Sequence, residues 1–305
     1  MHEGAIGSDV VRQHGYDVLW IPSAHGSYGP WLSESMHEVN ARTVVVDVRD
    51  DLSRQGLESL HDRGCLVVLL DDLSDRRFAA DLVFYPPVPQ VLRADWTNFR
   101  GERFVGWEWT ILRSQFASAL HRQPPRGRSV LITMGGSDPA GITLQAVRAV
   151  ELANADCSPV IVLGSGFQHR KALVELLATA RRQFTIRENV SDMRTLMVQS
   201  DLALCSYGMT AFELAASGVP AIYLCLTDDH GESASALENA GAGRSLGVFS
   251  GVEDRRLATA LTELLTDPAR RAQMSDKGQK LIDGQGAARI AKMLAHRLEN
   301  SGECA

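Results

Sequence analysis

One stretch, residues 130–139, constrains the fold of this chain more than any other. It opens with an apolar run, continues with Gly135 and Gly136, and ends with Asp138 and Pro139. The run predicts a short buried strand, the glycines permit a sharp turn, and Asp-Pro is typical of a helix start. Such a turn directs backbone N–H groups and a helix dipole towards one point, which predicts an anion site. An ordinary tight turn fits the local pattern equally well.

The same alternation of strand-like and helix-like segments runs through most of the chain. Short apolar or β-branched runs, each followed by a helical pattern or a turn, occupy residues 17–21, 43–48, 65–70, 82–85, 130–134, 159–163, 184–187, 202–205 and 221–226. Runs of this kind are typical of buried parallel strands in doubly wound, Rossmann-like α/β units. Because ligands bind at the carboxyl ends of such strands, we expect an interdomain cleft lined by these ends.

The periodic pattern stops at residues 121–128, where proline, glycine and arginine replace it. Such a break is typical of a linker between two domains. We therefore predict an N-terminal Rossmann-like domain over residues 1–120 and a second, ligand-binding domain over residues 129–286. Residues 287–305 carry a one-sided apolar stripe, which predicts a C-terminal helix that packs back towards the N-terminal domain.

Composition excludes several classes of function. The chain has 305 residues, of which 45% are hydrophobic and 22% charged, as in a globular protein of two domains. A formal net charge of −6 argues against a nucleic-acid partner. The five cysteines form no C-x-x-C pair, which favours a reducing cytoplasm, and no metal motif is present. No apolar stretch approaches the roughly 20 residues that span a bilayer.

A second informative stretch covers residues 202–220. It reads as a strand, a turn, a helix from about Thr210, and a stop at Gly218. The helix start again points towards the predicted cleft. Thr210 and Glu213 have the spacing of a capping box, in which the carboxylate accepts from a backbone N–H, and the local sequence alone favours this structural role for Glu213.

Three separated motifs resemble the PseG/SpsG family: GWEWTILRSQF at residues 106–116, GGSDP at 135–139 and GMTAFE at 208–213. That family comprises nucleotide-sugar hydrolases of pseudaminic acid synthesis and spore-coat polysaccharide proteins predicted to be glycosyltransferases. Both are similar to MurG and share the GT-B fold of two Rossmann-like domains. The resemblance implies a GT-B-like fold and a glycosyltransferase without a cofactor or metal, in polysaccharide, glycoconjugate or natural-product sugar biosynthesis. Its partners would be a nucleotide-diphosphate sugar, UDP by analogy, and an unknown acceptor.

The resemblance also implies roles for single residues. The first loop, Gly135, Gly136 and Ser137, would contact the donor diphosphate. The second loop, Gly208, Met209 and Thr210, would close on the diphosphate from the other side. The carboxylate of Glu213 would hold the ribose hydroxyls. Helix N-termini facing phosphates and a carboxylate facing two hydroxyls are chemically suited to such a ligand. Glu213 can act as a cap, as a ligand or as both.

The sequence departs from the family at its start. Family members begin with a strand and a Gly-x-Gly-His loop whose histidine acts in the hydrolases, and this N-terminal domain lacks both. Where the hydrolases carry an Asp-His-Tyr segment, only Asp47 is kept. These departures weaken the hydrolase assignment.

Three residues are candidates for the chemistry, because transfer from a nucleotide sugar needs a general base near the acceptor oxygen. His230 follows a core strand among acidic residues, His25 follows the run at residues 17–21, and Asp47 is the residue kept from the segment of the hydrolases. The alternative for His230 is a solvent-exposed loop histidine without a catalytic role. The alternative for His25 is a position in a connecting loop without a function. Asp71 and Asp72 at a strand end are more typical of helix caps.

Several functions stay open at this stage. The first is a glycosyltransferase, the second a PseG-like UDP-sugar hydrolase that releases free sugar and UDP. The third is a non-catalytic nucleotide-sugar-binding subunit, which the missing first strand and loop suggest. A start site placed too late would explain the same absence.

Overall fold

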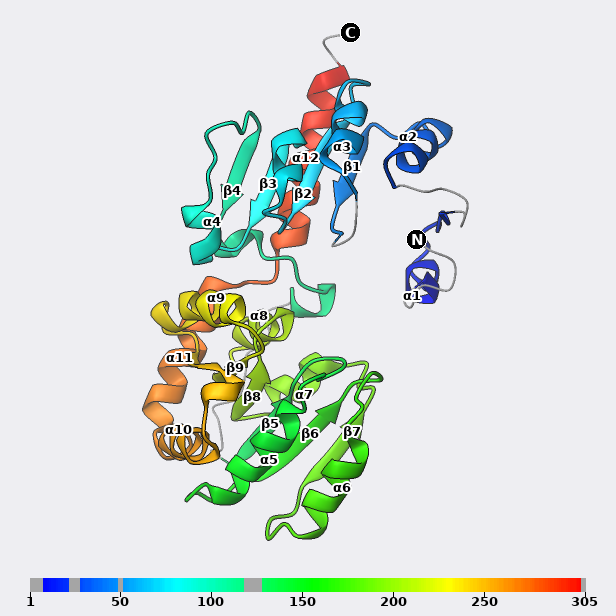
Figure 1. The fold of residues 1–305 in the computed structure, drawn as a ribbon. Coiled ribbons are helices and arrows are strands. Elements are labelled where there is room, and N and C mark those ends of the chain that lie inside the picture. Colours follow the sequence, from blue (N-terminus) through cyan, green and yellow to red (C-terminus); the bar gives the residue numbers. More distant parts are fainter. Residues whose placement is uncertain (1–7, 22–27, 49–51, 118–127, 303–305) are drawn as a thin grey trace. The chain divides into compact units, whose positions relative to one another are not determined.

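A computed structural model describes residues 8–21, 28–48, 52–117 and 128–302 (Figure 1). By its internal contacts the chain divides into two units, Met1–Pro86 with Arg93–Val105 and Pro87–Leu92 with Gly106–Ala305. The second unit thus includes residues 106–117, which the sequence pattern groups with the N-terminal domain. Most of the predicted linker lies outside the described residues.

The first unit contains a parallel sheet in the order β1-β2-β3-β4. Its strands are β1 (Thr43–Val46), β2 (Leu66–Leu70), β3 (Leu82–Tyr85) and β4 (Glu102–Val105). The apolar runs of β2 and β3 form its buried centre, as expected of parallel strands covered on both faces. The other elements of this unit are α1 (Ser8–Gln13), α2 (Tyr28–Glu38), α3 (Arg54–His61) and η1 (Asp75–Ala79). The short helix α4 (Pro89–Arg93) follows β3 in the sequence, but most of it belongs to the second unit.

The strand predicted at residues 17–21 is wrong. In the described part of the chain these residues belong to neither sheet; Ile21 forms a single bridge, and Leu19 is 44% exposed. An apolar run becomes a strand of a sheet only where it pairs over several residues with a neighbouring strand, and among the described residues neither sheet includes this run. The edge strand β4 was missed for the opposite reason, since its sequence Glu-Arg-Phe-Val shows no apolar run.

The second unit contains a six-stranded parallel sheet in the order β10-β9-β8-β5-β6-β7. All five strands predicted here are present, and β10 adds one at the edge. Their bounds are β5 (Ser129–Thr133), β6 (Ser158–Leu163), β7 (Thr185–Glu188), β8 (Leu202–Ser206), β9 (Ala221–Cys225) and β10 (Arg244–Val248). The chain builds outward from β5 to β7 and then crosses back to β8, so the topological switch point lies between β5 and β8.

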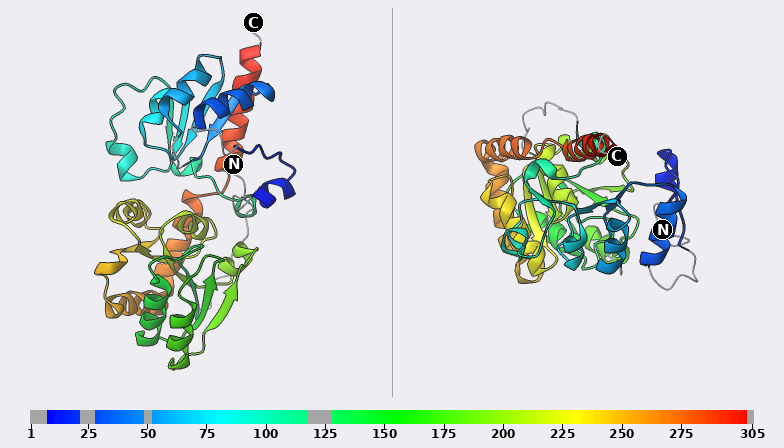
Figure 2. Two further views of the ribbon diagram at one scale, coloured as in Figure 1. Left: turned by 45° about the vertical axis from the view of Figure 1, so that its right-hand side comes forward. Right: turned by 90° about the horizontal axis from the view of Figure 1, so that it is seen from above.

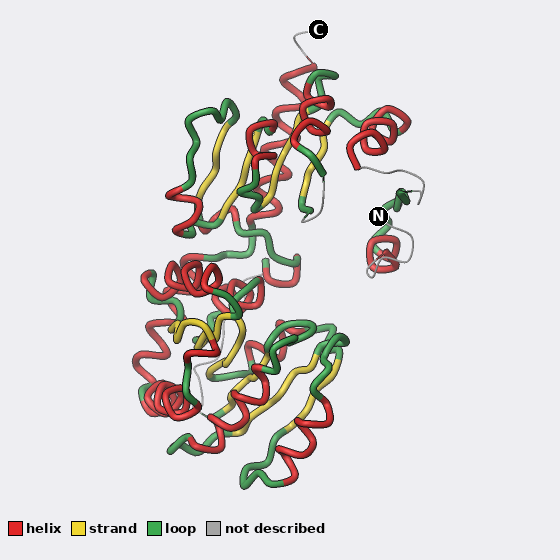
Figure 3. Tube along the Cα trace, in the orientation of Figure 1, coloured by secondary structure: helices red, strands yellow, loops and turns green. Residues whose placement is uncertain are grey.

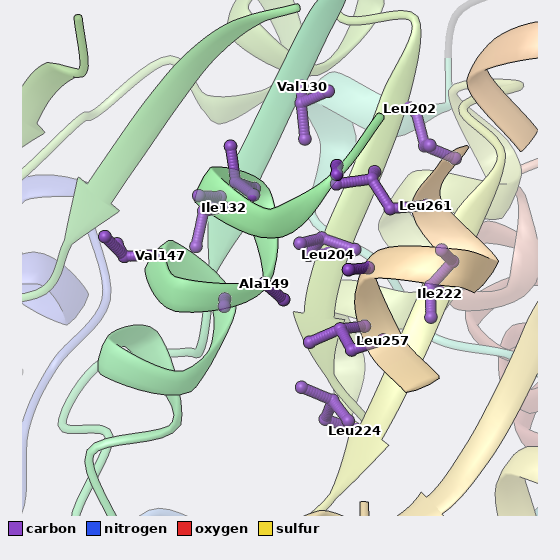
Figure 4. Packing of buried hydrophobic residues seen from close by; sticks show 14 of the residues in the cluster. Val130, Ile132, Val147, Ala149, Leu202, Leu204, Ile222, Leu224, Leu257 and Leu261 are labelled. Atoms are coloured by element: carbon purple, nitrogen blue, oxygen red, sulfur yellow. The ribbon is translucent and has the colours of Figure 1, made fainter. Parts of the chain in front are cut away.

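Helices cover both faces of this sheet, as Figures 2 and 3 show. They are α5 (Ile142–Leu152), α6 (Arg170–Ala178), α7 (Met193–Val198), α8 (Met209–Ala216), α9 (Asp228–Asn239), α10 (Asp254–Thr266) and α11 (Pro268–Leu281). Alternate residues of β5 serve opposite faces: Val130 and Ile132 pack with α5 and α10 (Figure 4), whereas Leu131 packs with α8. This alternation is the period of two that a strand imposes. Two apolar layers thereby fix β5 and the loop that follows it.

The chain ends in α12 (Gly286–Gly302), whose first turn contacts η2 (Trp107–Trp109). A Cβ atom on Gly286 would collide with the carbonyl oxygen of Thr110, so the two backbones touch closely. Packing of this helix against the N-terminal domain stays a prediction. Among the described residues no helix has the length and apolar character to cross a membrane.

Candidate functional site

The first glycine loop follows β5 at the switch point. Gly135 adopts φ +80°, which glycine tolerates best, and the loop is exposed through Gly136 and Ser137. Thr133 is in register with Cys205 of β8, and a Cβ atom on Gly135 would lie 3.8 Å from the Ser206 Oγ. The loop therefore lies beside the end of β8.

The backbone N–H groups of this loop are available to a ligand. In the described part of the chain, no acceptor pairs with the N–H groups of Gly135, Gly136 or Ser137. The Gly136 carbonyl, in contrast, accepts a bond of 3.1 Å from the Gly166 N–H. A Cβ atom on Gly164 would lie 2.5 Å from the Gly136 Cα and closer still to its carbonyl oxygen. The loop after β6 thus supports the glycine turn from behind.

Asp138 acts differently from the sequence prediction. The helix does not begin at Pro139 but at Ile142, after Gly141 in the left-handed conformation. Asp138 is buried, and its two carboxylate oxygens accept from the N–H groups of Ile142 and Thr143, each at 2.8 Å. The protein's own carboxylate therefore occupies the first amides of α5, and an anion at this site has to bind the loop amides instead.

This cap gives the first prediction. Asp138→Ala leaves two buried N–H groups without their acceptor, so we expect a loss of about 1–2 kcal/mol in the free energy of unfolding. Urea titration measures it. Asp192→Ala is the control, because Asp192 is exposed and accepts only one backbone bond, from the Thr195 N–H at 2.9 Å. Equal losses in the two variants would contradict the special role of the buried cap.

The second loop joins β8 to α8. Gly208 has an extended backbone, and a Cβ atom on it would meet no atom within 4 Å. The N–H groups of Met209 and Thr210 pair with no acceptor among the described residues, and the Met209 side chain is 52% exposed. Because β5 and β8 are neighbours in the sheet, both loops present free amides at the same edge.

Glu213 does not form the predicted capping box. The helix starts at Met209, one residue earlier than predicted, so Glu213 lies beyond the first turn. Its side chain is buried and pairs with Arg113 at distances of 3.0 Å from Nε and 2.9 Å from Nη2. Burial raises the pKa of Glu213, and the Arg113 guanidinium opposes that rise. A buried carboxylate with an arginine partner fits a ligand-binding role better than a helix cap.

His230 lies at the same edge of the sheet. It is in the first turn of α9, where its N–H donates to the Thr227 Oγ1 at 3.2 Å. Its ring lies 6.2 Å from that of Tyr207, the residue before Gly208. The Nδ1 atom is buried and has no hydrogen-bond partner in the described part of the protein. His230 is thus held beside the second loop rather than projecting freely into solvent.

The other candidate residues are not joined to this site. Asp47 is exposed after β1 in the first unit, and His25 lies outside the described residues. Trp107 packs on Phe212 with ring centroids 6.4 Å apart, which agrees with a core role. Asp72 accepts from the Ser74 N–H at 2.8 Å and from the Arg76 Nε at 2.6 Å, so its role is structural.

Sequence reasoning missed two contributors to the site, Arg113 and Gly164. Arg113 is part of the motif at residues 106–116, but nothing in the local pattern pairs it with Glu213, one hundred positions along the chain. Gly164 and Gly166 directly follow the apolar run of β6, and a glycine pair at a strand end was a detectable signal of close backbone approach. Within the described residues no group of three or more His, Cys, Asp or Glu side chains could hold a metal ion.

Comparisons with known proteins agree with this geometry. The model of the glycosyltransferase family 28 C-terminal domain matches residues 130–293, more than half of the chain. The spore coat polysaccharide biosynthesis protein SpsG of Bacillus subtilis is 27% identical over 195 residues, 63% of this chain and 57% of that protein. This match confirms the resemblance inferred from the three motifs.

A second relative extends the comparison. The UDP-N-acetylglucosamine–N-acetylmuramyl-(pentapeptide) pyrophosphoryl-undecaprenol N-acetylglucosamine transferase of Acidithiobacillus ferrooxidans is 32% identical over 209 residues, 64% of this chain and 57% of that protein. The chain thus spans little more than half the length of these relatives.

Solved structures share the fold. Acinetobacter baumannii MurG has a TM-score of 0.68 at 16% identity, with 97% of this chain and 89% of that chain covered. Anabaena HepE in complex with UDP-glucose has a TM-score of 0.61 at 15% identity, with 95% and 88% covered. The protein therefore has the two parallel-sheet, Rossmann-like domains of the GT-B fold.

Proposed function

The chain belongs to the family of the glycosyltransferase family 28 C-terminal domain, and from this premise we propose that it is a GT-B-type glycosyltransferase that uses a nucleotide-diphosphate sugar. One observation carries the proposal. Two loops at the switch point of the second sheet, residues 135–137 and 208–210, present backbone N–H groups that no described residue accepts. Such amides are the groups that bind phosphate oxygens.

The proposed chemistry follows from these groups. Loss of the nucleoside diphosphate places negative charge on the leaving group, and preorganised amides stabilise charge that develops in the transition state. The N-terminus of α8 adds the positive end of its dipole. Together these groups supply positive potential without requiring a bound cation. The unpartnered Nδ1 of His230 makes it our candidate for the general base.

Glu213 is the proposed ribose ligand. Arg113 donates to its Oε1 only, and the Oε2 accepts no hydrogen bond from any described residue. An ionised carboxylate oxygen is a strong acceptor for a sugar hydroxyl. A similar transferase is named for UDP-N-acetylglucosamine, and a protein of the same fold has been solved in complex with UDP-glucose, which supports UDP as the nucleotide. The sugar acceptor belongs to polysaccharide, glycoconjugate or natural-product synthesis in this proposal.

The test combines binding and turnover in the full chain. Calorimetry with UDP tests the site, and no binding would contradict the proposal. Incubation with UDP-sugars, with and without candidate acceptors, tests the reaction. Transfer that depends on an acceptor supports a glycosyltransferase, free sugar released without an acceptor indicates a hydrolase, and binding without turnover indicates a non-catalytic subunit.

Glu213→Gln gives the second prediction. The amide keeps the shape of the side chain but replaces a charged acceptor, so we expect UDP to bind about fivefold more weakly, roughly 1 kcal/mol. Inorganic diphosphate, which has no ribose, should bind both proteins equally. Glu175→Gln, on the exposed face of α6, is the matched control. Unchanged UDP affinity in Glu213→Gln would remove Glu213 from the site.

A further inference from the structure

Arg113 contacts Glu213 in an asymmetric way. The Nε atom donates to Oε1 at 3.0 Å, and the Nη2 atom lies 2.9 Å from the same oxygen as an ion-pair contact. Both guanidinium nitrogens thus approach one carboxylate oxygen of Glu213. The usual bidentate arrangement of arginine with a carboxylate would have engaged both oxygens. Here the pair instead leaves one oxygen, Oε2, free to accept from a ligand.

The backbone that carries Arg113 is fixed against α8. Leu112 and Phe116, on either side of it, are buried in the same apolar cluster as Ala211 and Leu214. The Arg113 guanidinium also lies over the Phe116 ring, 5.3 Å from its centroid.

The C-terminal segment holds the same stretch from elsewhere in the unit. The Arg289 Nη1 donates to the Glu108 carbonyl at 3.1 Å, and the Gln285 Nε2 donates to the Ala117 carbonyl at 2.6 Å. A Cβ atom on Gly284 would collide with the Phe116 carbonyl oxygen. Arg113 thus reaches Glu213 from a well-packed segment, not from a free loop.

The charge environment of Glu213 depends on this arginine. Burial raises the pKa of Glu213, and among the described residues Arg113 is the charged group that lowers it. The titratable groups of the neighbouring strands are Cys205 of β8 and Tyr223 and Cys225 of β9, whose pKa values burial raises. The helix α11, which packs on α8, carries the charged residues Arg270, Arg271, Asp276, Lys277 and Lys280. Loss of Arg113 would therefore leave the effect of burial on the pKa of Glu213 without the opposing effect of this arginine.

We propose that Arg113 is a positioning residue of the nucleotide site: by binding Oε1 of Glu213 it presents Oε2, in its anionic form, to the ribose hydroxyls of the donor. The inference rests on the proposed function, because it needs a nucleotide in the site. Arg113 acts here through Glu213 and makes no contact of its own with the ligand.

A double-mutant cycle tests this assignment. We expect Arg113→Met to weaken UDP binding about three- to fivefold at pH 7.5, but to have no further effect in a Glu213→Gln background. Arg113→Lys, which keeps the charge, should recover part of the loss. Arg170→Met is the matched control, because Arg170 forms an exposed pair with Glu188. Melting temperatures confirm that each variant is folded.

The pH dependence gives a readout that packing alone would not change. In Arg113→Met the carboxylate pKa is higher, so UDP affinity that depends on the ionised form is lost at a higher pH as the solution is acidified. In a plot of UDP affinity against pH, the loss of affinity at low pH should occur at a higher pH in Arg113→Met than in wild type. This loss should be absent in Glu213→Gln.

The outcomes separate the two proposals. Equal losses from Arg113→Met in both backgrounds would mean that the arginine contacts the ligand directly, which overturns the inference while UDP binding stands. Wild-type affinity in Arg113→Met, or a loss of affinity at the same low pH as in wild type, would overturn it too. No UDP binding by the wild-type protein would overturn the proposed function, and this inference with it.

Discussion

A Gly136→Val protein is expected to bind UDP at least about tenfold more weakly than wild type, on the order of 1.4 kcal/mol, while unfolding at nearly the same temperature. A Cβ atom on Gly136 meets no described protein atom within 4 Å, so it would point into open space at the proposed diphosphate loop. Gly136 is not among the glycines with positive φ, whereas Gly135 is. The valine therefore interferes with the ligand rather than with the backbone.

The control for this variant is Gly251→Val. Gly251 also has open space around a Cβ atom and no positive φ, but it lies in η4 (Phe249–Gly251) after the edge strand β10. It should leave both UDP affinity and melting temperature unchanged. Calorimetry and thermal melts on both variants decide the matter. A folded Gly136→Val protein with wild-type affinity would remove the anion site, and with it the observation that carries the proposed function.

Gly164→Ala is expected to lower UDP affinity by about tenfold or more and also to destabilise the protein by about 1–3 kcal/mol. Its new methyl group would overlap the Gly136 backbone, and backbone cannot move aside as the end of a side chain can. The glycine turn must shift, and its amides lose the arrangement that suits a diphosphate. Affinity and stability should therefore fall together, unlike in Gly136→Val.

Gly166→Ala supplies a graded comparison. There a Cβ atom would lie 3.1 Å from the Ser137 Cβ and 3.3 Å from the Gly136 carbonyl oxygen, a mild compression. We expect smaller losses in both measurements. If Gly164→Ala binds UDP as wild type does, or if Gly166→Ala is the more damaging change, the loop after β6 does not support the site as described.

The strands of the second unit could be predicted from sequence because their information is local. Each is a short apolar run that ends at a turn signal, and a parallel strand buried on both faces needs little else. The run at residues 17–21 has the same local character and still forms no sheet strand, since pairing depends on a neighbour far along the chain. The pattern of apolar residues thus predicts which segments can become strands, and pairing with distant segments of the chain decides which of them do.

The candidate site divides in the same way. The two glycine loops are visible in the sequence, because glycine marks places where backbone must approach closely or turn sharply. The partners of the site are not visible. The spacing of Thr210 and Glu213 predicts a local cap, yet Glu213 turns to Arg113, and Asp138 caps α5 from four positions before its first residue. Side chains choose among distant partners that no short pattern contains.

The position of β5 between β6 and β8 has a consequence for how the protein acquires its site. The first loop is made when β5 is, but the second follows β8, which the chain reaches only after completing β7. The chain between β5 and β8 loses conformational entropy when its ends come together, before the pairing of β5 with β8 offsets that loss. A nascent chain that ends before β8 therefore contains the first glycine loop but not the second, and so lacks the complete phosphate site. A nucleotide that contacts both loops would link the ends of β5 and β8 and so stabilise the pairing of these two strands.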